Sequence, residues 1–187
     1  MTTTISAPRY ISLEDFDNIP EGPPFYEREP DGRLIEVASA KIDHNTLMGR
    51  LFGGLDAHVR LQRLGRVVMV TDVYFSSGRV YIPDVCFLTR EQLSLIGEDG
   101  KVHGAPTMVA ELVSEGGQSR DRVAKRHAYE EEGVEWYWLI DSETLDIDEY
   151  HLEDGRYIRT AHCAFGEDFE PLLLPGWSAN LAELMAE

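Results

Sequence analysis

The stretch "TMVAELVSEGGQSRDRVAKRHAYEEEGVEWYWLID", Thr107 to Asp141, predicts a strand, a helix and a second strand in succession. Residues 107–114 form a near-continuous apolar run of strand length, and residues 134–142 form another. Between them, residues 119–132 are expected to be helical, with Gly133 just past the helix end, where a left-handed backbone is common. A strand, a helix and a returning strand make one parallel crossover unit, so the stretch predicts an α/β domain built on a sheet.

The segments before this stretch add a helix and a pair of strands. Apolar residues recur at intervals of three and four between residues 43 and 64, which indicates an amphipathic helix with Asp43 as its expected N-cap. Residues 65–77 and 78–89 are predicted to be two strands, joined as a hairpin through a Ser-Ser-Gly turn. Residues 94–106 are expected to form a polar loop.

Turn residues mark two further hairpins and the limits of the domain. A Pro-Asp-Gly turn at residues 30–32 and an Asp-Gly turn at residues 154–155 each separate two extended segments. The C-terminal segment is predicted to be a short helix capped by Ser178. We expect residues 1–24 to form an N-terminal arm and residues 25–187 to form a single domain. Its core is a mixed β-sheet flanked by helices, with added hairpins.

The composition is that of an ordinary globular protein. Of 187 residues, 43% are hydrophobic and 27% are charged, which is close to the average of soluble domains. The longest apolar runs fall short of the roughly 18 to 20 residues of a membrane helix, and "MTTTISAPRY" lacks the apolar centre of a secretory signal. Cys86 and Cys163 stand in apolar surroundings without a CxxC pair, which favours buried, reduced thiols. We therefore expect a cytoplasmic protein with no membrane partner.

The charge balance argues against one class of partner. The chain has 17 Lys and Arg residues against 34 Asp and Glu residues, which gives a net charge of −17. Such a charge repels a phosphate backbone at long range, and it excludes a broad basic face for DNA. An enzyme that acts on nucleic acid would therefore need local positive potential or bound divalent cations.

Two predicted strands each carry one carboxylate in an apolar setting: Asp84 in "VYIPDVCFLT", residues 80–89, and Glu111 in "TMVAELVS". The neighbouring Pro83 removes a ladder donor and predicts a bend or bulge in its strand. A buried acid is costly unless it is paired, neutralised or bound to a metal. Taken alone, Asp84 is equally consistent with a capping role near a turn, whereas two acids on neighbouring strands can share Mg²⁺ or Mn²⁺.

Lys125 is the candidate cation of the predicted helix. It stands four residues after Asp121 and on the same helix face. Reaching back toward the strand ends, its ammonium group would stabilise charge that develops on a phosphate. The alternative is a solvated lysine that pairs with Asp121.

Other conspicuous residues have structural interpretations. His44 stands near a helix start and is expected to cap or to pack. Tyr129, Tyr137 and Trp138 have the spacing of core residues. The run of glutamates at residues 130–132 is predicted to be a solvated helix end, although acids are unfavourable at that terminus.

The ordered set of these motifs resembles the Uma2 (DUF820) family of restriction-endonuclease-like proteins, within the PD-(D/E)xK nuclease superfamily. The earlier segment "YEREPDGRLIEV" and His44 also resemble that family's N-terminal YE…DG segment and its helix-starting histidine. The likeness runs from about residue 25 to residue 160. The matching residues are Pro83-Asp84, Glu111, Ser114, Asp121, Lys125, Tyr129, Gly133-Val134, Tyr137-Trp138 and Asp141.

The resemblance implies a restriction-endonuclease-like fold and a metal site. Asp84 and Glu111 would take the two metal-ligand positions for Mg²⁺ or Mn²⁺, together with the backbone carbonyl of Leu112. Glu27, which matches the family's early glutamate, could add a further carboxylate to the catalytic site.

The resemblance has departures as well. The lysine of the motif usually stands two residues after the glutamate, where this chain has Val113, and Lys125 from the following helix is the candidate replacement. Arg33 stands where the family tends to place an acid, which would alter the mouth of the site. Glu115 replaces the usual proline after Ser114, which would loosen the loop into the helix.

The implied activity is Mg²⁺-dependent hydrolysis of phosphodiester bonds in DNA or, less expected, RNA. Two alternatives stay open: a non-catalytic binding or assembly module with an acidic surface, and a regulator whose acidic surface mimics DNA. A homodimer or higher homo-oligomer is expected for a nuclease that cuts both strands. The C-terminal hairpin and the apolar face of residues 181–185 would supply its surface.

Overall fold

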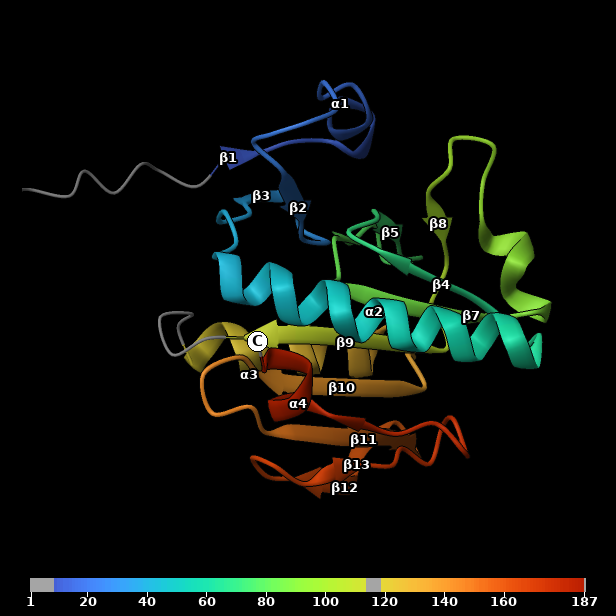
Figure 1. Ribbon diagram of the computed structural model, residues 1–187. Coiled ribbons are helices and arrows are strands. Elements are labelled where there is room, and N and C mark those ends of the chain that lie inside the picture. Colours follow the sequence, from blue (N-terminus) through green and yellow to red (C-terminus); the bar gives the residue numbers. More distant parts are fainter. Residues whose placement is uncertain (1–8, 114–118, 187) are drawn as a thin grey trace, which may run out of the picture.

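Two six-stranded sheets organise the chain in the computed structural model, which describes residues 9–113 and 119–186, the side chains of residues 119–122 excepted (Figure 1). The main sheet has the order β12-β11-β10-β9-β7-β4. Its strands are β4 (Gly65–Met69), β7 (Val85–Thr89), β9 (Met108–Val113), β10 (Trp136–Asp141), β11 (Ile147–Glu153) and β12 (Arg156–Cys163).

The second sheet, here called the short-strand sheet, has the order β1-β3-β2-β6-β5-β8. Its strands are β1 (Arg9–Tyr10), β2 (Tyr26–Arg28), β3 (Arg33–Glu36), β5 (Val73–Tyr74), β6 (Val80–Tyr81) and β8 (Val102–His103). A further strand pair is formed by β13 (Asp168–Phe169) and β14 (Ala179–Asn180). The helices are α1 (Leu13–Asp17), α2 (Ile42–Gln62), the 3₁₀ helix η1 (Glu91–Leu95), α3 (Ser119–Glu131) and α4 (Leu181–Met185).

The predicted crossover unit is confirmed. Strands β9 and β10 are parallel neighbours, with Glu111 in register with Leu139, and α3 connects them. Gly133 follows the helix with a φ of 77°, the left-handed conformation that suits glycine. The other strand pairs of the main sheet are antiparallel. The fold is therefore the expected mixed α/β architecture with added hairpins.

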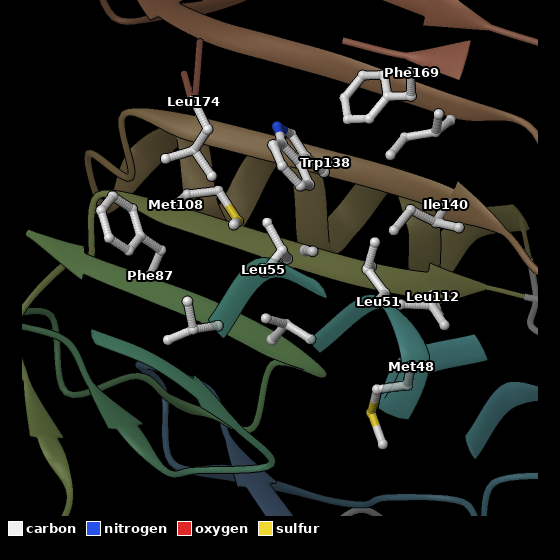
Figure 2. Packing of buried hydrophobic residues seen from close by; sticks show 14 of the residues in the cluster. Met48, Leu51, Leu55, Phe87, Met108, Leu112, Trp138, Ile140, Phe169 and Leu174 are labelled. Carbon is white, nitrogen blue, oxygen red and sulfur yellow. The ribbon is translucent and has the colours of Figure 1, made fainter. Parts of the chain in front are cut away.

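Helix α2 covers one face of the main sheet, as its apolar spacing predicts. Leu47, Leu51, Leu55 and Val59 are each fully buried, and they belong to one cluster with side chains of β9 and β10 (Figure 2). Burying each such side chain stabilises the fold by about 1.5–3 kcal/mol. The predicted core position of Trp138 is confirmed in this cluster.

Helix α3 covers the opposite face through a second cluster. This cluster combines Val109 of β9 with Tyr129 of α3 and Tyr137 of β10, and all three side chains are fully buried. The rings of Tyr129 and Tyr137 lie 5.7 Å apart between centroids. The core interpretation of both tyrosines is thus confirmed. The side chain of Glu111 shares this face with Val109, because residues two apart on a strand point to the same side.

The two strands predicted at residues 65–77 and 78–89 each break in the middle, so the continuous-strand prediction is wrong. The first predicted strand is divided into β4 and β5 at Val70, whose φ of 48° is unusual for a β-branched residue. The second predicted strand is divided into β6 and β7 at Pro83, which has no backbone N–H to donate to a neighbouring strand. In both cases the chain passes from one sheet to the other. The predicted bend at Pro83 is confirmed, and it leaves Asp84 at the junction of the two sheets.

Two predicted helix caps are wrong. Helix α2 begins at Ile42 after Lys41, so Asp43 lies inside the first turn. Helix α4 is capped by Asn180, whose side chain accepts hydrogen bonds from the backbone of Ala182 and Glu183. Strand β14 runs directly into that helix, which moves its start past Ser178. The predicted polar loop at residues 94–106 holds the end of η1 and the strand β8.

The apolar face of α4 packs against the protein's own core rather than facing outward. Leu181 is 3% exposed, and Leu184 and Met185 pack against the same cluster. The protein's own core therefore takes up part of this face, and the homo-oligomer predicted through it and the C-terminal hairpin stays a prediction. Both cysteines are buried and unpaired, as predicted. Within the described residues, no helix is both long and apolar enough to cross a membrane.

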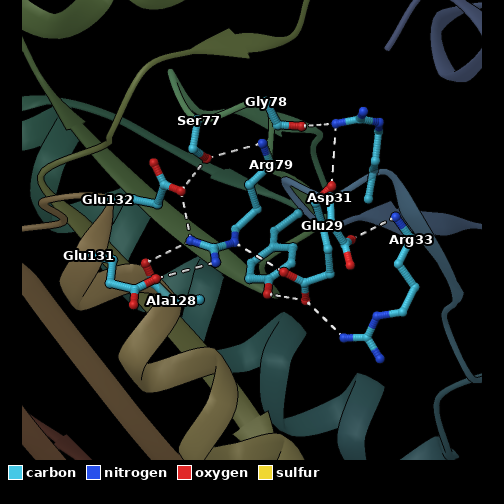
Figure 3. A network of polar contacts seen from close by, with 11 residues as sticks. Glu29, Asp31, Arg33, Ser77, Gly78, Arg79, Ala128, Glu131 and Glu132 are labelled. Carbon is cyan, nitrogen blue, oxygen red and sulfur yellow. Dashed lines mark hydrogen bonds and ion pairs between the residues drawn. The ribbon is translucent and has the colours of Figure 1, made fainter. Parts of the chain in front are cut away.

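Arg79 ties the end of α3 to the short-strand sheet (Figure 3). Its guanidinium group lies 3.3 Å from Glu29, 2.6 Å from Glu132 and 3.4 Å from Glu131. It also donates a hydrogen bond of 3.3 Å to the backbone carbonyl of Ala128 in the last turn of the helix. A cation at this terminus offsets the unfavourable acids there.

The glutamate run is therefore only partly a solvated helix end. Glu132 is 5% exposed and pairs with Arg79, and Glu130 is 8% exposed and pairs with Arg156. Glu131, at 71% exposed, is the residue that matches the prediction. The two buried glutamates anchor α3 to neighbouring strands.

Replacing Arg79 with lysine is expected to lower the free energy of unfolding by about 2 kcal/mol. A lysine keeps the charge but cannot hold three carboxylates and a carbonyl with one planar group. Urea unfolding measures the loss, with Arg60→Lys as control, because Arg60 is 76% exposed in an i,i+4 pair and is expected to change stability by about 0.5 kcal/mol or less. Equal losses in both variants would contradict an anchoring role for Arg79.

Candidate active site

A pocket of about 1240 Å³ is lined by residues from α2, α3 and both sheets. Asp84, Glu111, Leu112 and Lys125 all line it, and so does His44. Of these five residues, all except His44 are predicted as site residues from the sequence.

Asp84 is fixed by two contacts, one on each carboxylate oxygen. Its Oδ2 accepts a hydrogen bond of 2.7 Å from the backbone N–H of Leu112, and its Oδ1 lies 3.1 Å from Nε2 of His44. The first contact exists because β7 and β9 stop pairing at Val85 and Ala110. The Leu112 N–H lies beyond that ladder, and the Asp84 side chain takes the place of a strand partner.

Glu111 is held on the α3 face of β9. Its Oε1 accepts a hydrogen bond of 2.6 Å from the hydroxyl of Tyr129 and lies 3.4 Å from Nζ of Lys125. Burial raises the pKa of Glu111 to about 7, and the Lys125 charge opposes that rise. Burial disfavours a charged carboxylate, so this group is poised to gain a cation or a proton.

Lys125 points from α3 between two carboxylates. Its Nζ donates a hydrogen bond of 2.8 Å to Oε1 of Glu27 and lies 3.4 Å from Oε1 of Glu111. Burial lowers the pKa of Lys125, but the charges of Glu111 and Glu27 outweigh it and raise the pKa well above the ordinary value. The ammonium group is therefore charged and fixed, and the alternative of a solvated lysine is wrong. The side chain of Asp121 lies outside the described part of the chain.

Glu27 reaches this group from β2 in the short-strand sheet. It is 4% exposed, and its Oε1 also accepts a hydrogen bond of 3.1 Å from the backbone N–H of Ile82. Its contact within the site is with Lys125, which it orients. Arg33 pairs with Glu29 at 3.8 Å and, of the residues described, is not among those that line the pocket. Ser114 and Glu115 lie outside the described residues.

Sequence reasoning missed two participants, His44 and the hydroxyl of Tyr129. Tyr129 follows Lys125 by four residues on α3, so a helix that aims the lysine at Glu111 aims the tyrosine there too. His44 precedes the buried residues Leu47 and Met48 by three and four residues, which puts it on the buried face of α2. These spacings were the available signals.

Replacing His44 with glutamine is expected to remove a pH-dependent part of the stability, of the order of 1 kcal/mol. The hydrogen bond to Asp84 raises the pKa of His44 from 6.5, although burial lowers it. A raised folded pKa stabilises the protein below the unfolded value of 6.5, and that contribution is lost as the pH rises through the folded value.

The measurement is urea unfolding in a chelator at about pH 5.5 and about pH 9, with His58→Gln on the same helix as control. The difference between wild type and His44→Gln is expected at the lower pH and should shrink at the higher one. A difference of the same size at both pH values would mean that only packing was lost.

The donor set of the pocket suits the divalent cation that the sequence implies. The carboxylates of Asp84 and Glu111 and the backbone of Leu112 offer oxygen atoms, which Mg²⁺ and Mn²⁺ prefer. The buried hydroxyl of Tyr137 lines the same pocket and has no hydrogen-bond partner among the described residues. Because Mg²⁺ usually keeps several water ligands, a hydrated ion suits a pocket with such a hydroxyl.

The charged side chains of the site are nevertheless paired with one another in the structure. Within the described part of the chain, no group of three or more His, Cys, Asp or Glu residues is already arranged to hold a metal ion. Lys125 and His44 contact the same carboxylates that a cation would use. The residues fit the ion in their chemistry, and both contacts of Glu111, with Lys125 and with Tyr129, are made by its Oε1.

Comparisons with known proteins give concordant results. The model of the Uma2 family, described as "Putative restriction endonuclease", matches residues 13–182. The solved structure of a "putative nuclease belonging to DUF820" from Anabaena variabilis ATCC 29413 superimposes with a TM-score of 0.76 at 17% sequence identity. That alignment covers 94% of this chain and 97% of the other chain. A search of the curated proteins found no match.

Proposed function

Because the chain belongs to the Uma2 family of restriction-endonuclease-like proteins, we propose that it is a divalent-metal-dependent endonuclease that hydrolyses phosphodiester bonds of DNA. Family membership supports a nuclease-like function in general terms. The observation that carries the finer proposal is the meeting of Asp84, Glu111 and Lys125 in one pocket. Two carboxylates and one fixed ammonium group are what metal-assisted phosphodiester hydrolysis requires.

Asp84, Glu111 and the carbonyl of Leu112 would hold Mg²⁺ or Mn²⁺. The ion, when bound, supplies a Lewis acid for the phosphate and lowers the pKa of a coordinated water. In the overall reaction, water adds to phosphorus and one P–O ester bond breaks. The leaving oxygen receives a proton, so the products are one hydroxyl end and one phosphate end.

The other side chains of the pocket hold these groups in position. Glu27 fixes the ammonium group of Lys125 at 2.8 Å, so that Lys125 can donate a hydrogen bond to a phosphate oxygen as its charge develops. Tyr129 orients Glu111, and His44 orients Asp84. Preorganised partners of this kind reduce the rearrangement needed during the reaction.

A second candidate function is a non-catalytic module with the same fold. The net charge of −17 favours it, as does the pairing of the carboxylates with Lys125 and His44. Calorimetric titration with Mg²⁺ and Mn²⁺ separates the two functions. The nuclease is expected to bind metal at millimolar concentration or below, and the non-catalytic module is expected to bind none.

The test of the nuclease is cleavage of plasmid DNA with Mg²⁺ or Mn²⁺, compared with the same reaction in a chelator. Wild type is expected to cleave only with metal, and Glu111→Gln is expected to lose about 10³-fold or more, since it removes a proposed ligand. Glu153→Gln is the control for the substitution itself, because the side chain of Glu153 is 56% exposed on β11 and outside the pocket. Equal residual cleavage by wild type and Glu111→Gln would indicate contamination and overturn the proposal.

A further inference from the structure

The wall of the pocket beyond the charged groups is largely apolar. Phe25 and Val70 line it, and they are 44% and 46% exposed. Phe25 directly precedes β2, and its carbonyl accepts a hydrogen bond of 2.9 Å from Val37 on the other side of the hairpin. The phenyl ring is therefore a solvent-exposed surface on a fixed backbone at the pocket.

Val70 is held at the pocket by an uncommon backbone conformation. Its φ of 48° is disfavoured for a β-branched residue, and its N–H donates a hydrogen bond of 3.2 Å to the carbonyl of Asp84. The surrounding structure thus keeps an exposed apolar side chain beside the candidate catalytic carboxylate. Strained conformations of this kind cluster at ligand-binding sites.

The charged residues of the wall do not favour a phosphate backbone. Outside the candidate catalytic group, the charged side chains that line the pocket in the described part of the chain are Glu36, Lys41, Asp43 and Glu143, three acids and one base. A duplex presents two backbones whose phosphates must be met by Lys and Arg. Among the described residues that line the pocket, Lys41 and Lys125 are the Lys and Arg side chains, which are too few to meet the phosphates of two backbones.

Apolar and aromatic surfaces recognise bases only when the bases are unpaired. In a duplex the base faces are stacked on one another, whereas in a single strand they are free to stack on aromatic side chains. Each such stack contributes about 1–3 kcal/mol and is independent of sequence. A volume of about 1240 Å³ is also of the order of a ligand pocket, roughly 300–1,000 Å³.

We propose that the pocket takes an unpaired DNA strand, with bases on the apolar wall around Phe25 and Val70 and one phosphate at Asp84, Glu111 and Lys125. The inference rests on the proposed nuclease function and specifies its substrate class. Single-stranded DNA and the single-stranded arms of branched DNA are then cleaved in preference to continuous duplex. Binding depends more on stacking than on phosphate contacts, which makes it compatible with the acidic chain.

The test uses one labelled oligonucleotide in two forms, single-stranded and annealed to its complement, with the full-length protein and Mn²⁺. Wild type is expected to cleave the single strand at least about 10-fold faster than the duplex. Phe25→Ala is expected to slow cleavage of the single strand about 5- to 150-fold, the equivalent of one lost stack. Phe165→Ala is the control, because Phe165 is 66% exposed and does not line the pocket.

Binding in a chelator gives a readout that is independent of activity. Fluorescence anisotropy with the labelled single strand is expected to show weaker binding by Phe25→Ala than by wild type and Phe165→Ala. Cleavage of duplex as fast as single strand, with Phe25→Ala unchanged, would overturn the inference and leave the nuclease function standing. If neither form is cleaved, the nuclease function fails, and the anisotropy comparison decides alone whether the apolar wall binds unpaired DNA.

Discussion

Replacing Asp84 with asparagine is expected to lower metal-dependent cleavage by about 10³-fold or more. Loss of a residue that merely orients a metal ligand typically costs 10- to 100-fold, and a direct ligand costs more. The two oxygens of Asp84 have different contacts. Its Oδ2 is fixed by the Leu112 N–H at 2.7 Å, and its Oδ1 faces the pocket beside His44. An asparagine keeps the size but offers a single oxygen for both. Single-turnover cleavage at saturating Mg²⁺ measures the change.

The control for this prediction is Asp72→Asn. Asp72 resembles Asp84 in exposure, at 25% against 18%, and pairs with Lys101 at 2.9 Å, but it does not line the pocket. The Asp72→Asn variant is expected to cleave DNA at the wild-type rate. If Asp84→Asn retained more than about a tenth of the wild-type rate while folding normally, Asp84 would not be a ligand of the metal.

The part of the fold that could be predicted from sequence depends on local patterns. The β9–α3–β10 unit follows from two apolar runs around an amphipathic helix, and the hairpins follow from Pro-Asp-Gly and Asp-Gly turns. In each case the residues that determine the element lie within it. The same holds for Glu111 and Lys125, because a strand and the helix after it are brought together by a short connection.

The parts that could not be predicted depend on distant residues. Residues 65–89 read as two continuous strands because neither Val70 nor Pro83 announces which sheet the next segment will join. His44 contacts Asp84 across 40 residues of sequence. The burial of Glu132 depends on Arg79, 53 residues earlier. Such pairings are set by tertiary packing, which sequence periodicity does not report.

The net charge is a property of the whole chain, and it does not describe the charges at one site. An excess of acids predicts repulsion of nucleic acid for the chain as a whole. In the candidate catalytic group, however, the acids Glu27, Asp84 and Glu111 each already contact a cationic or ionisable partner, Lys125 or His44. Local pairing therefore decides which charges a phosphate would meet.

Replacing Lys125 with methionine is expected to lower cleavage by about 10²- to 10³-fold, the usual cost of losing one donor to the developing charge. It also leaves Glu27 and Glu111 buried without their common cation. Breaking a buried pair in this way costs about 3–5 kcal/mol when the remaining acid stays charged. Cleavage assays and urea unfolding in a chelator measure the two effects separately.

The stability loss of Lys125→Met should depend on pH, and the sign follows from the raised pKa of Glu111. The carboxyl group binds its proton more tightly folded, with a pKa of about 7, than unfolded, at 4.5. The free energy of unfolding therefore falls as the pH rises from 4.5 to about 7. Without the Lys125 charge the pKa of Glu111 in the folded protein rises further, so the fall continues to higher pH. A small loss at about pH 5 and a large loss at about pH 8 are expected.

Two further variants separate charge from packing. Lys101→Met is matched in exposure, at 24% against 20%, and removes an ion pair with Asp72 outside the pocket. It is expected to leave cleavage unchanged. The double variant Lys125→Met, Glu111→Gln removes the ammonium charge together with one of its two partner carboxylates, so it should regain part of the stability lost at about pH 8 and none of the cleavage, while Glu27 stays without its cation. If the double variant were as unstable as Lys125→Met, the contact between Lys125 and Glu111 would contribute nothing to stability, and the loss would come from the contact with Glu27 and from packing of the lysine side chain.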